Sequence, residues 1–318
     1  MVSLGRALRL TVFALGVIVF LLAASVVFGS RFPAVQAHAR LVTVLILPRA
    51  ACCTVAEAWR AVWRLKREQD SGPEYYANLR EGNSDPEGRE QWSTPVGDFW
   101  IPKGNLGSLA YLLLERDRSK IGEVVRPGDI VLDCGANVGI YTREALSKGA
   151  RLVVAIEPAP ENIACLRRTF AREIEDKRVI VYPKGVWDEP GNLDLTVDEH
   201  NSEMDTFVLE GELARHGSTV RRVQVPVTTI DLLAAELDLS RVDLIKMDIE
   251  GAEQRALKGA RATLARFRPR MAIAGYHLPD DPDGIPAIVK AARPDYLVSP
   301  SACIVNRGRV MPETLFFR

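Results

Sequence analysis

The feature that most constrains the fold of this chain is an alternation, beyond residue 128, of short apolar runs with segments of helical pattern. The apolar runs have the length and composition of buried strands: Asp129–Cys134, Leu152–Ile156, Val179–Tyr182, Val242–Asp248 and Met271–Tyr276. Helices are predicted between or after them at Gly139–Ser147, Glu161–Arg172, Asp231–Glu236 and Ala252–Phe267. Repeated strand–helix–strand units predict an α/β domain with a parallel sheet and helices on both faces.

Weaker signals add strands to this domain. Leu193–Val197 and Val223–Ile230 contain alternating or β-branched apolar residues, which is typical of strands. Near the carboxyl terminus, Tyr296–Ser299 and Thr314–Phe317 lie on either side of the turn sequence Asn306–Gly308 and predict an antiparallel hairpin.

The amino terminus carries a different feature. No charged residue occurs between Arg9 and Arg31, and Leu10–Phe28 is almost wholly apolar. As a helix, this segment would span roughly 28 Å, close to the hydrocarbon thickness of a bilayer. We therefore expect a transmembrane helix within a single-pass membrane anchor over residues 1–31. The alternatives are a signal peptide cleaved near Ala37–Ala39, or a membrane hairpin that includes Leu41–Leu47.

The chain between the anchor and the α/β domain is basic and then irregular. Apolar residues from Val55 to Trp63 recur at helical spacing among basic residues, which predicts a helix at the membrane interface or against the domain. Ser71–Glu90 is rich in Gly, Pro, Asn, Asp and Glu without periodicity, and predicts a linker. The expected organisation is an anchor (1–31), a juxtamembrane segment with linker (32–90) and one α/β domain (91–318).

The composition excludes some classes of function. The 41 basic and 41 acidic residues cancel, so the chain has no overall positive field to hold nucleic acid, and we expect no such partner. Five cysteines are too few for a disulfide scaffold and favour a reducing compartment.

Polar residues follow the predicted strands, at the edge of the sheet where parallel α/β domains bind ligands. The first strand leads from Asp133 into a turn that contains Gly135, Asn137 and Gly139, and the second strand leads into Glu157. A carboxylate at this second position can accept hydrogen bonds from both hydroxyls of a ribose.

Two adenosine-containing ligands compete for this pattern. A nicotinamide dinucleotide would need glycines where the chain has Asn137 and Ile140, and Asp133 would repel its pyrophosphate. S-adenosylmethionine has a positively charged sulfonium and no phosphate, so we favour it. If Asp133 only caps the turn, the pattern implies no ligand.

Longer segments make the interpretation more specific. LDCGANVGIYT, IEPAPENIACLRR, VDLIKMDIEGAE and RPRMAIAGYH occur in this order, together with WSTPVGDFWIP and VTTIDLL. Over residues 92–318 the chain resembles the FkbM-type family of S-adenosylmethionine-dependent methyltransferases. The resemblance implies a Rossmann-like class I methyltransferase fold with a seven-stranded sheet, and O-methylation of hydroxyls, often on sugars or polyketide-like metabolites. The chain departs from many members at Gly275–His277, where they carry a glutamate.

Three residues are candidates for catalysis. Asp248 ends the fourth parallel strand, the position that faces the transferred methyl group in this fold class, and Lys246 lies on the same side of that strand. His277 follows the fifth strand and is a typical general base. The alternatives are an ion pair of Lys246 with Asp133 or Asp248 that only stabilises the sheet, and a structural histidine. His200–Met204 lies in an irregular stretch and is expected to cover the substrate.

Glu250 and Glu253 follow Asp248 closely, and three carboxylates together could bind Mg²⁺. We favour instead the stabilisation of a helix amino terminus by negative charge, because no histidine or further acid cluster completes a site in the sequence. We therefore expect no metal.

Taken together, these patterns predict a membrane-anchored S-adenosylmethionine-dependent O-methyltransferase that acts on a small molecule, a sugar or a lipid-linked acceptor. We expect its domain on the cytosolic side, where S-adenosylmethionine is supplied, and the arginines after the apolar run slightly favour this orientation. The alternatives are a tethered domain that binds S-adenosylmethionine without turnover, and an oxidoreductase. No pattern predicts the oligomeric state.

Overall fold

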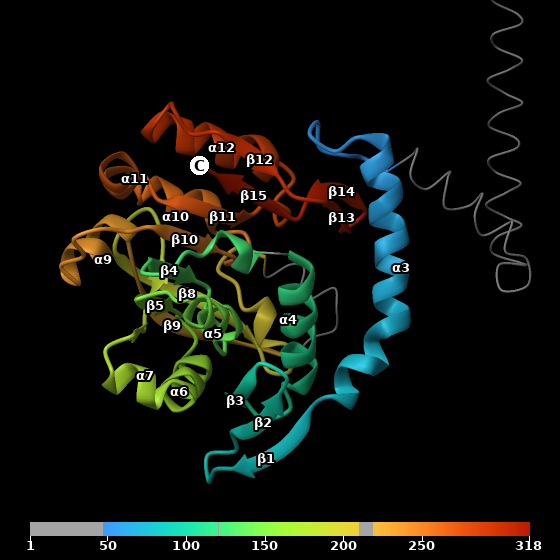
Figure 1. Cartoon of the computed structure of the whole chain (residues 1–318), viewed down its shortest axis with the longest axis vertical. Coiled ribbons are helices and arrows are strands. Elements are labelled where there is room, and N and C mark those ends of the chain that lie inside the picture. The colour runs from blue at the N-terminus through green and yellow to red at the C-terminus, as the bar shows by residue number, and fades with distance from the viewer. Residues whose placement is uncertain (1–46, 120, 210–218) are drawn as a thin grey trace, which may run out of the picture. The chain divides into compact units, whose positions relative to one another are not determined.

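A computed structural model describes residues 47–119, 121–209 and 219–318 (Figure 1). Contacts divide the chain into two units: unit 1 includes the residues up to Gln69 with Ala302–Met311, and unit 2 comprises Asp70–Ser301 with Pro312–Arg318. The expected anchor Leu10–Phe28 and the alternative cleavage site lie outside the described residues. Within those residues, no helix combines the length and the apolar character needed to cross a membrane.

Unit 2 is built on a seven-stranded sheet with the strand order β12-β15-β11-β10-β4-β5-β6. The five parallel strands are β4 (Ile130–Cys134), β5 (Leu152–Ile156), β6 (Val179–Tyr182), β10 (Leu244–Met247) and β11 (Arg270–Ala274). At one edge, β15 (Thr314–Phe317) runs antiparallel to both β11 and β12 (Val298–Pro300). The prediction of a mostly parallel seven-stranded sheet is confirmed, and the two predicted carboxyl-terminal strands do pair antiparallel as β12 and β15. They do not form the expected hairpin, because the turn at Asn306–Gly308 joins two further strands, β13 (Cys303–Asn306) and β14 (Arg309–Pro312), which pair in a sheet of their own.

Helices cover both faces of this sheet, because alternate side chains of each strand point to opposite sides. In β4, Leu132 belongs to the core of one face and Val131 to the core of the other. The first core includes residues of α9 (Ile230–Glu236), α10 (Glu253–Lys258), α11 (Arg261–Phe267) and α12 (Asp281–Ala292). The second includes residues of α4 (Leu106–Ser119), α5 (Ile140–Ser147), α6 (Pro160–Thr169) and α7 (Ala171–Glu175), with η1 (Ile121–Val124) beside them. α4 and α12 were not predicted.

Two predicted helices are interrupted. Glu161–Arg172 is divided into α6 and α7 at Phe170, and Ala252–Phe267 into α10 and α11 near Gly259. A Cβ atom at Gly259 would lie 2.2 Å from the carbonyl oxygen of Trp187, so this glycine allows a distant segment to approach the helix pair. Helical periodicity cannot reveal an interruption that comes from such a tertiary contact.

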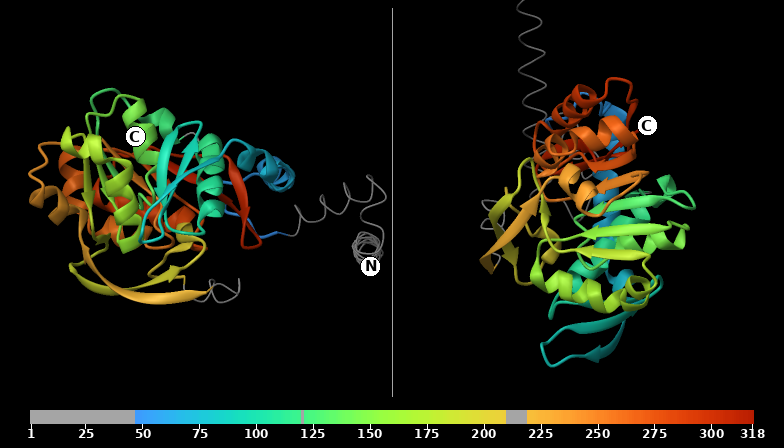
Figure 2. Two further views of the ribbon diagram at one scale, coloured as in Figure 1. Left: turned by 90° about the horizontal axis from the view of Figure 1, so that it is seen from below. Right: turned by 90° about the vertical axis from the view of Figure 1, so that its left-hand side faces the viewer.

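Other strands form smaller sheets. β8 (Gly191–Asp198) and β9 (Val220–Thr228) pair antiparallel, and β9 also pairs with the short β7 (Gly185–Val186), so the two predicted strands of this region exist but stand outside the main sheet (Figure 2).

The predicted linker Ser71–Glu90 is instead largely regular structure. It contains the end of α3 (Val55–Ala77) and all of β1 (Arg80–Ser84), which pairs with β2 (Glu90–Thr94), and β2 pairs with β3 (Gly97–Ile101). Every residue of β1 is exposed, so this strand lacks the apolar alternation by which a sequence reveals a strand.

Unit 1 contains the start of α3 and the hairpin of β13 (Cys303–Asn306) and β14 (Arg309–Pro312). The predicted helix from Val55 is confirmed. It begins with a capping box, in which the Glu57 amide donates to Thr54 Oγ1 and the Thr54 amide donates to Glu57 Oε2. A disulfide joins Cys53 to Cys303. The expectation that the cysteines are all reduced is therefore wrong for this pair, whose partners lie 250 residues apart in the sequence.

Candidate active site

The glycine turn after β4 is held against the loop after β10. Gly135 has a φ of +76°, and a Cβ atom there would lie 2.0 Å from the carbonyl oxygen of Asp248. The Asp248 amide in turn donates to the carbonyl oxygen of Cys134 at 3.1 Å. Glycine is therefore required at this position because two strand ends meet there, and the contact places Asp248 beside the turn.

Glu157 organises the same turn from the end of β5. It is 4% exposed, and its carboxylate accepts hydrogen bonds from the amides of Asn137 (2.8 Å) and Ala159 (2.9 Å). Burial raises the pKa of Glu157, and these two hydrogen bonds oppose the rise. Asn162 Nδ2 also approaches Glu157 Oε1, at 3.5 Å, whereas Oε2 accepts from Asn137 alone among the described contacts, so acceptor capacity for a ribose hydroxyl remains on Oε2. Glu157 and Asn137, both predicted to bind the cofactor, do lie together.

The backbone amides of the glycine turn donate hydrogen bonds within the protein and are not directed at a phosphate group. The amides of Gly135 and Ala136 donate to the Ile156 carbonyl oxygen, that of Asn137 to Glu157, and that of Gly139 to the Ala136 carbonyl oxygen. A pyrophosphate site needs such amides directed at the ligand. This arrangement disfavours the dinucleotide alternative.

Asp133 and Lys246 form an ion pair between neighbouring strands. They are directly paired in the β4–β10 register, with Lys246 Nζ 3.4 Å from Asp133 Oδ1, and Lys246 also donates to the Gly135 carbonyl oxygen at 2.9 Å. Thr142 Oγ1 donates to Asp133 Oδ2 at 2.6 Å. Burial raises the pKa of Asp133, while the charge of Lys246 and the bond from Thr142 oppose this.

Asp133 and Gly139 were both predicted to bind the cofactor, and their contacts in the structure are with other parts of the protein. Asp133 is 0% exposed and has no surface of its own for a ligand, so it acts on the turn through Lys246 and Thr142. Gly139 has a φ of +97°, and a Cβ atom there would lie 2.3 Å from the ring of Phe170, so it serves the packing of α5 on α6. The alternative in which Asp133 serves the turn structurally fits the geometry better than direct contact.

A short segment within His200–Met204, the stretch expected to cover the substrate, contacts the glycine turn. The η2 turn (Ser202–Met204) contacts it through Ser202, whose carbonyl oxygen accepts from Asn137 Nδ2 at 2.9 Å. The Ser202 amide donates to Asn105 Oδ1 at 2.9 Å, and this residue precedes α4. The segment is thus fastened to both the turn and the first helix of the second core.

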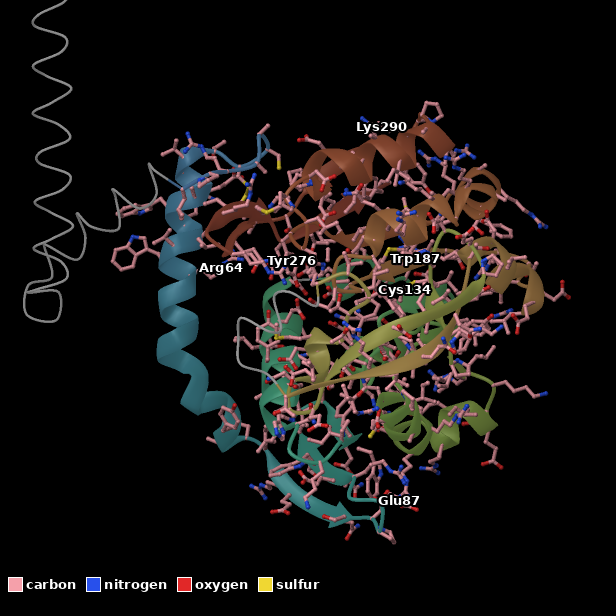
Figure 3. The ribbon with its side chains drawn as sticks, turned by 180° about the vertical axis from the view of Figure 1, so that it is seen from behind. Arg64, Glu87, Cys134, Trp187, Tyr276 and Lys290 are labelled. Atoms are coloured by element: carbon pink, nitrogen blue, oxygen red, sulfur yellow. A yellow bond between two sulfur atoms is a disulfide. The ribbon has the colours of Figure 1, made fainter. Side chains whose placement is uncertain are left out.

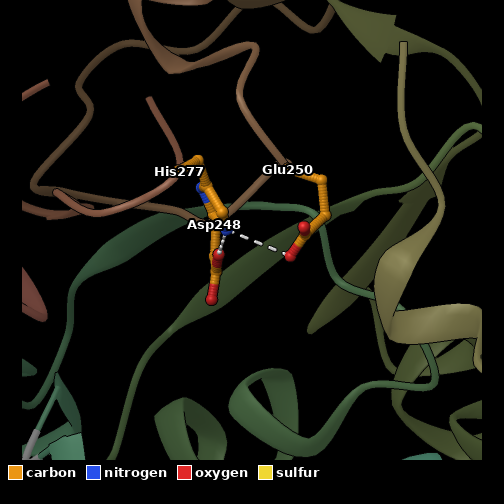
Figure 4. A group of neighbouring side chains, drawn as sticks. All are labelled: Asp248, Glu250 and His277. Carbon is orange, nitrogen blue, oxygen red and sulfur yellow. Dashed lines mark hydrogen bonds and ion pairs between the residues drawn. The ribbon is translucent and has the colours of Figure 1, made fainter. Parts of the chain in front are cut away.

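Beyond Asp248, a histidine and three carboxylates come together. His277 Nε2 lies 3.1 Å from Glu250 Oε1 and 3.5 Å from Asp248 Oδ1, and its Nδ1 lies 2.9 Å from Glu253 Oε1 (Figure 4). Asp248 and His277, two of the candidates for catalysis, lie together. Glu250 and Glu253 also contact His277, so the argument from sequence that no histidine completes a site with these carboxylates is wrong. His277 joins them because β10 and β11 are adjacent parallel strands whose carboxyl ends meet.

The two glutamates of this group have different roles. Glu253 lies in the first turn of α10, as the helix-dipole interpretation predicted, and its carboxylate accepts from the amides of Ile249 (2.8 Å) and Gly251 (3.1 Å). Glu250 precedes the helix with a left-handed φ of +50°, and its side chain approaches His277 instead. The strained backbone at Glu250 is typical of functional loops.

The charges around His277 change its protonation. Burial alone would lower the pKa of His277, but the carboxylates of Glu250 and Glu253 hold it well above its usual value. These carboxylates therefore favour the protonated imidazole, whereas the sequence suggested a general base. Burial also raises the pKa of Asp248, against the opposing charges of His277 and Lys246.

Comparisons with known proteins find similarity to methyltransferases. The family model for the methyltransferase FkbM domain matches residues 133–293, slightly more than half of the chain. Methyltransferase 1 of Beauveria bassiana is 27% identical over 146 residues, which cover 41% of this chain and 57% of that protein. The 31-O-demethyl-FK506 methyltransferase FkbM of Streptomyces tacrolimicus is 27% identical over 181 residues, 49% of this chain and 70% of that protein. The solved structure of a methyltransferase FkbM from Methylobacillus flagellatus is 19% identical, with a TM-score of 0.44, and covers 80% of this chain and 60% of that one.

Proposed function

The chain belongs to the FkbM family of methyltransferases, and we propose that it transfers a methyl group from S-adenosylmethionine to a hydroxyl oxygen of its acceptor. The observation that carries this proposal is the contact at Gly135, which joins a ribose-binding arrangement at Glu157 to a polar cluster at Asp248. The relative from Streptomyces tacrolimicus is named for O-methyl transfer, which supports an oxygen acceptor here.

The residues present fit S-adenosylmethionine better than a phosphate-containing cofactor, since the turn amides are used within the chain and Glu157 keeps acceptor capacity. When bound, S-adenosylmethionine supplies a methyl group on a sulfonium: the acceptor oxygen forms the C–O bond, the C–S bond breaks with its electron pair left on sulfur, and the hydroxyl proton goes to a base or solvent. We assign Glu157 to the ribose hydroxyls and Asn137, beneath η2, to the turn beside them.

Asp248 and His277 lie beyond this turn, in the position to bind and orient the acceptor hydroxyl. Lys246 and Asp133 hold the turn and the strand end that carry them, and act as positioning residues. The acceptor is a small molecule, a sugar or a lipid-linked sugar. A membrane anchor at Leu10–Phe28 would favour the lipid-linked class by confining the site to the membrane surface.

The test is calorimetry with S-adenosylhomocysteine on the purified full chain, in detergent where the amino terminus requires it. We expect binding that Glu157→Ala weakens at least tenfold, because hydrogen bonds to a charged group contribute about 1.5–3 kcal/mol. Glu161→Ala is the matched control, since this exposed glutamate lies in the first turn of α6 and pairs with Arg221. Binding of NADH without binding of S-adenosylhomocysteine would contradict the proposal.

Turnover distinguishes the enzyme from a tethered binding domain. Extracts from cells that lack the protein, incubated with the full chain and methyl-labelled S-adenosylmethionine, are expected to yield a labelled product. Binding of S-adenosylhomocysteine with no labelled product from lipid, sugar or small-molecule fractions would favour the domain without turnover.

A further inference from the structure

We propose that Asp248, Glu250 and His277 form a binding site for one divalent metal ion, with Asp248 Oδ1, Glu250 Oε1 and His277 Nε2 as ligands. These three atoms lie within 4.8 Å of one another. The proposal has two parts: that the cation binds here, which stands on the geometry alone, and that it acts on the acceptor hydroxyl, which rests on the proposed methyl transfer.

The spacing of the atoms fits adjacent positions on one ion. Ligands at about 2.1–2.2 Å from a metal and at right angles to one another are about 3.0 Å apart. The distances from His277 Nε2 to Glu250 Oε1 and Asp248 Oδ1 are 3.1 and 3.5 Å. The two carboxylate oxygens approach the same imidazole nitrogen (Figure 4) and lie within 4.8 Å of each other, so side-chain adjustments would be needed to bring all three atoms onto one ion.

The second ring nitrogen of His277 contacts a carboxylate, as is typical of metal-bound histidines. His277 Nδ1 contacts Glu253 Oε1 at 2.9 Å, and Glu253 is 0% exposed. Two backbone amides fix the Glu253 carboxylate, so it cannot turn toward an ion and serves only to orient the ring. Metal-bound histidines almost always have such a partner on the other ring nitrogen, and it sets which nitrogen is directed at the metal.

Asp248 supplies a second observation, because its Oδ1 atom is incompletely paired. This atom has less than 1 Å² of exposed area and accepts no hydrogen bond from the described residues, although His277 Nε2 lies 3.5 Å from it. Buried carboxylate oxygens nearly always accept a hydrogen bond. Lys246, whose charge also acts on Asp248, is already paired with Asp133 and with the Gly135 carbonyl oxygen.

The balance of charge favours a cation of charge two. Three carboxylates, those of Asp248, Glu250 and Glu253, surround one imidazole. Two carboxylate oxygens and one imidazole nitrogen form a mixed ligand set that suits Mn²⁺ or Mg²⁺, with Zn²⁺ and Fe²⁺ as competitors. With an ion in place, His277 would bind it as the neutral ring and donate from Nδ1 to Glu253.

The second part concerns the reaction. A divalent ion lowers the pKa of a hydroxyl oxygen bound to it, and this removes the need for a free histidine base. The site adjoins Gly135, so a hydroxyl held on the ion would lie beside the turn assigned to the cofactor.

The first experiment uses Mn²⁺ alone. The full chain, stripped with a chelator and dialysed, is titrated with Mn²⁺, and free Mn²⁺ is followed by electron paramagnetic resonance without any nucleoside present. We expect one ion per chain. Glu250→Gln and His277→Ala should each weaken binding at least tenfold, and Glu253→Gln should weaken it about 10–100-fold through the orientation of His277.

Glu203→Gln is the matched control, because Glu203 is close enough to sense the charge of Glu250 but is not one of the three ligands. It should change the affinity less than threefold. Thermal unfolding of each variant shows whether the fold is kept, and S-adenosylhomocysteine calorimetry is measured on the same samples. Absence of Mn²⁺, Mg²⁺ and Zn²⁺ binding by the wild type, or equal affinity of folded Glu250→Gln and wild type, would overturn the site.

The two proposals fail separately. Mn²⁺ binding that depends on Glu250, in a chain that does not bind S-adenosylhomocysteine, would keep the metal site and remove the methyltransferase function. Methyl transfer that persists unchanged after chelation would remove the catalytic part of the metal proposal and leave the proposed function in place.

Discussion

Gly135 shows how one residue joins the two halves of the candidate site. It has a positive φ, and its α-carbon faces the carbonyl oxygen of Asp248 so closely that no side chain fits. The sequence singled out this glycine for its approach to a ligand. The structure gives it a second partner, the loop after β10, which sequence spacing could not identify.

Gly135→Ala is expected to lower the free energy of unfolding by about 2–4 kcal/mol, because the added Cβ atom must displace the loop at Asp248 and also adopt a strained φ. Urea denaturation measures the change. Gly191→Ala is the control, since a Cβ atom there would meet nothing within 4 Å and its φ is not positive, and its effect should stay below about 0.5 kcal/mol. Equal effects of the two substitutions would show that the loops do not meet as described.

Asp248 and His277 are expected to affect turnover more than cofactor affinity, since they lie beyond the turn and not within it. Once an acceptor is known, Asp248→Asn and His277→Ala should each lower kcat about 10²-fold or more, because a displaced hydroxyl no longer lies in line with the methyl group. Their affinity for S-adenosylhomocysteine should stay within about threefold of the wild type. Asp283→Asn, at an exposed site on α12, should leave both quantities unchanged, and near-normal rates in both site variants would contradict the assignment.

At the scale of elements, the amino terminus of α12 fastens a helix beside the cluster. Asp281, the first residue of this helix, is fully buried and accepts hydrogen bonds from the Leu278 amide and from Gln254 Nε2. Burial and the nearby charge of Glu253 raise the pKa of Asp281 to about 6. The sequence did not predict α12, whose prolines and glycine lower its helix propensity, so this contact was also missed.

The raised pKa of Asp281 predicts a pH dependence of stability. Because the folded pKa exceeds the unfolded one, the protonated side chain stabilises the fold below about pH 4, and this contribution is lost as the pH rises through about 6. Relative to Asp281→Asn, the wild type should therefore lose about 1 kcal/mol of stability between pH 5 and pH 7.5. Urea denaturation of both proteins at the two pH values measures this difference, and a constant difference would show that Asp281 titrates normally.

At the scale of the whole molecule, the two units differ in the state of their buried cysteines, which are free in unit 2 and joined in a disulfide in unit 1. Cys134 and Cys165 are buried in unit 2, and burial raises the pKa of the Cys165 thiol to about 12. Figure 3 labels Cys134 together with Lys290 and Glu87, which are exposed at the surface of the same unit. The disulfide of Cys53 and Cys303 belongs to unit 1, where Ala58, Ala61 and Val310 pack around it.

Cys53→Ser is expected to destabilise unit 1 by about 2–4 kcal/mol, because the disulfide ties two chain segments that are far apart in sequence. The neighbouring Cys52→Ser is the control and should have little effect, since this cysteine is outside the disulfide. Limited proteolysis of the two variants, with and without reductant, measures the change. If reductant accelerates cleavage of neither the wild type nor Cys52→Ser, the disulfide does not stabilise the unit.

The membrane anchor at Leu10–Phe28 and the side of the membrane that the domain would face both stay proposals. The supply of S-adenosylmethionine favours the cytosol, while the disulfide removes the support that reduced cysteines would have lent. We expect protease added to spheroplasts to cleave the region beyond residue 90 only after lysis. Cleavage in intact spheroplasts, or a mature amino terminus near Arg40, would instead support export or a cleaved signal peptide.

The order of strands and helices and the composition of the glycine turn could be predicted from the sequence, because they depend on local periodicity and on residues adjacent in the chain. β4, β5, β6, β10 and β11 all lie within or beside the predicted runs, and Glu157 lies beside Asn137 as expected. β1 was missed because an exposed edge strand has no apolar alternation.

Which of the polar residues at the strand ends contact one another depends on the tertiary structure alone. His277 reaches Glu250 and Glu253 because β10 and β11 are neighbours in the sheet, although the two segments are separated by α10 and α11 in the chain. Asp133 was expected to contact the cofactor, but in the structure this residue is buried and its carboxylate pairs with Lys246 and Thr142. Sequence spacing identifies which residue types stand at strand ends, but the distances and solvation that set their chemistry arise only when the strands pair and the helices cover them.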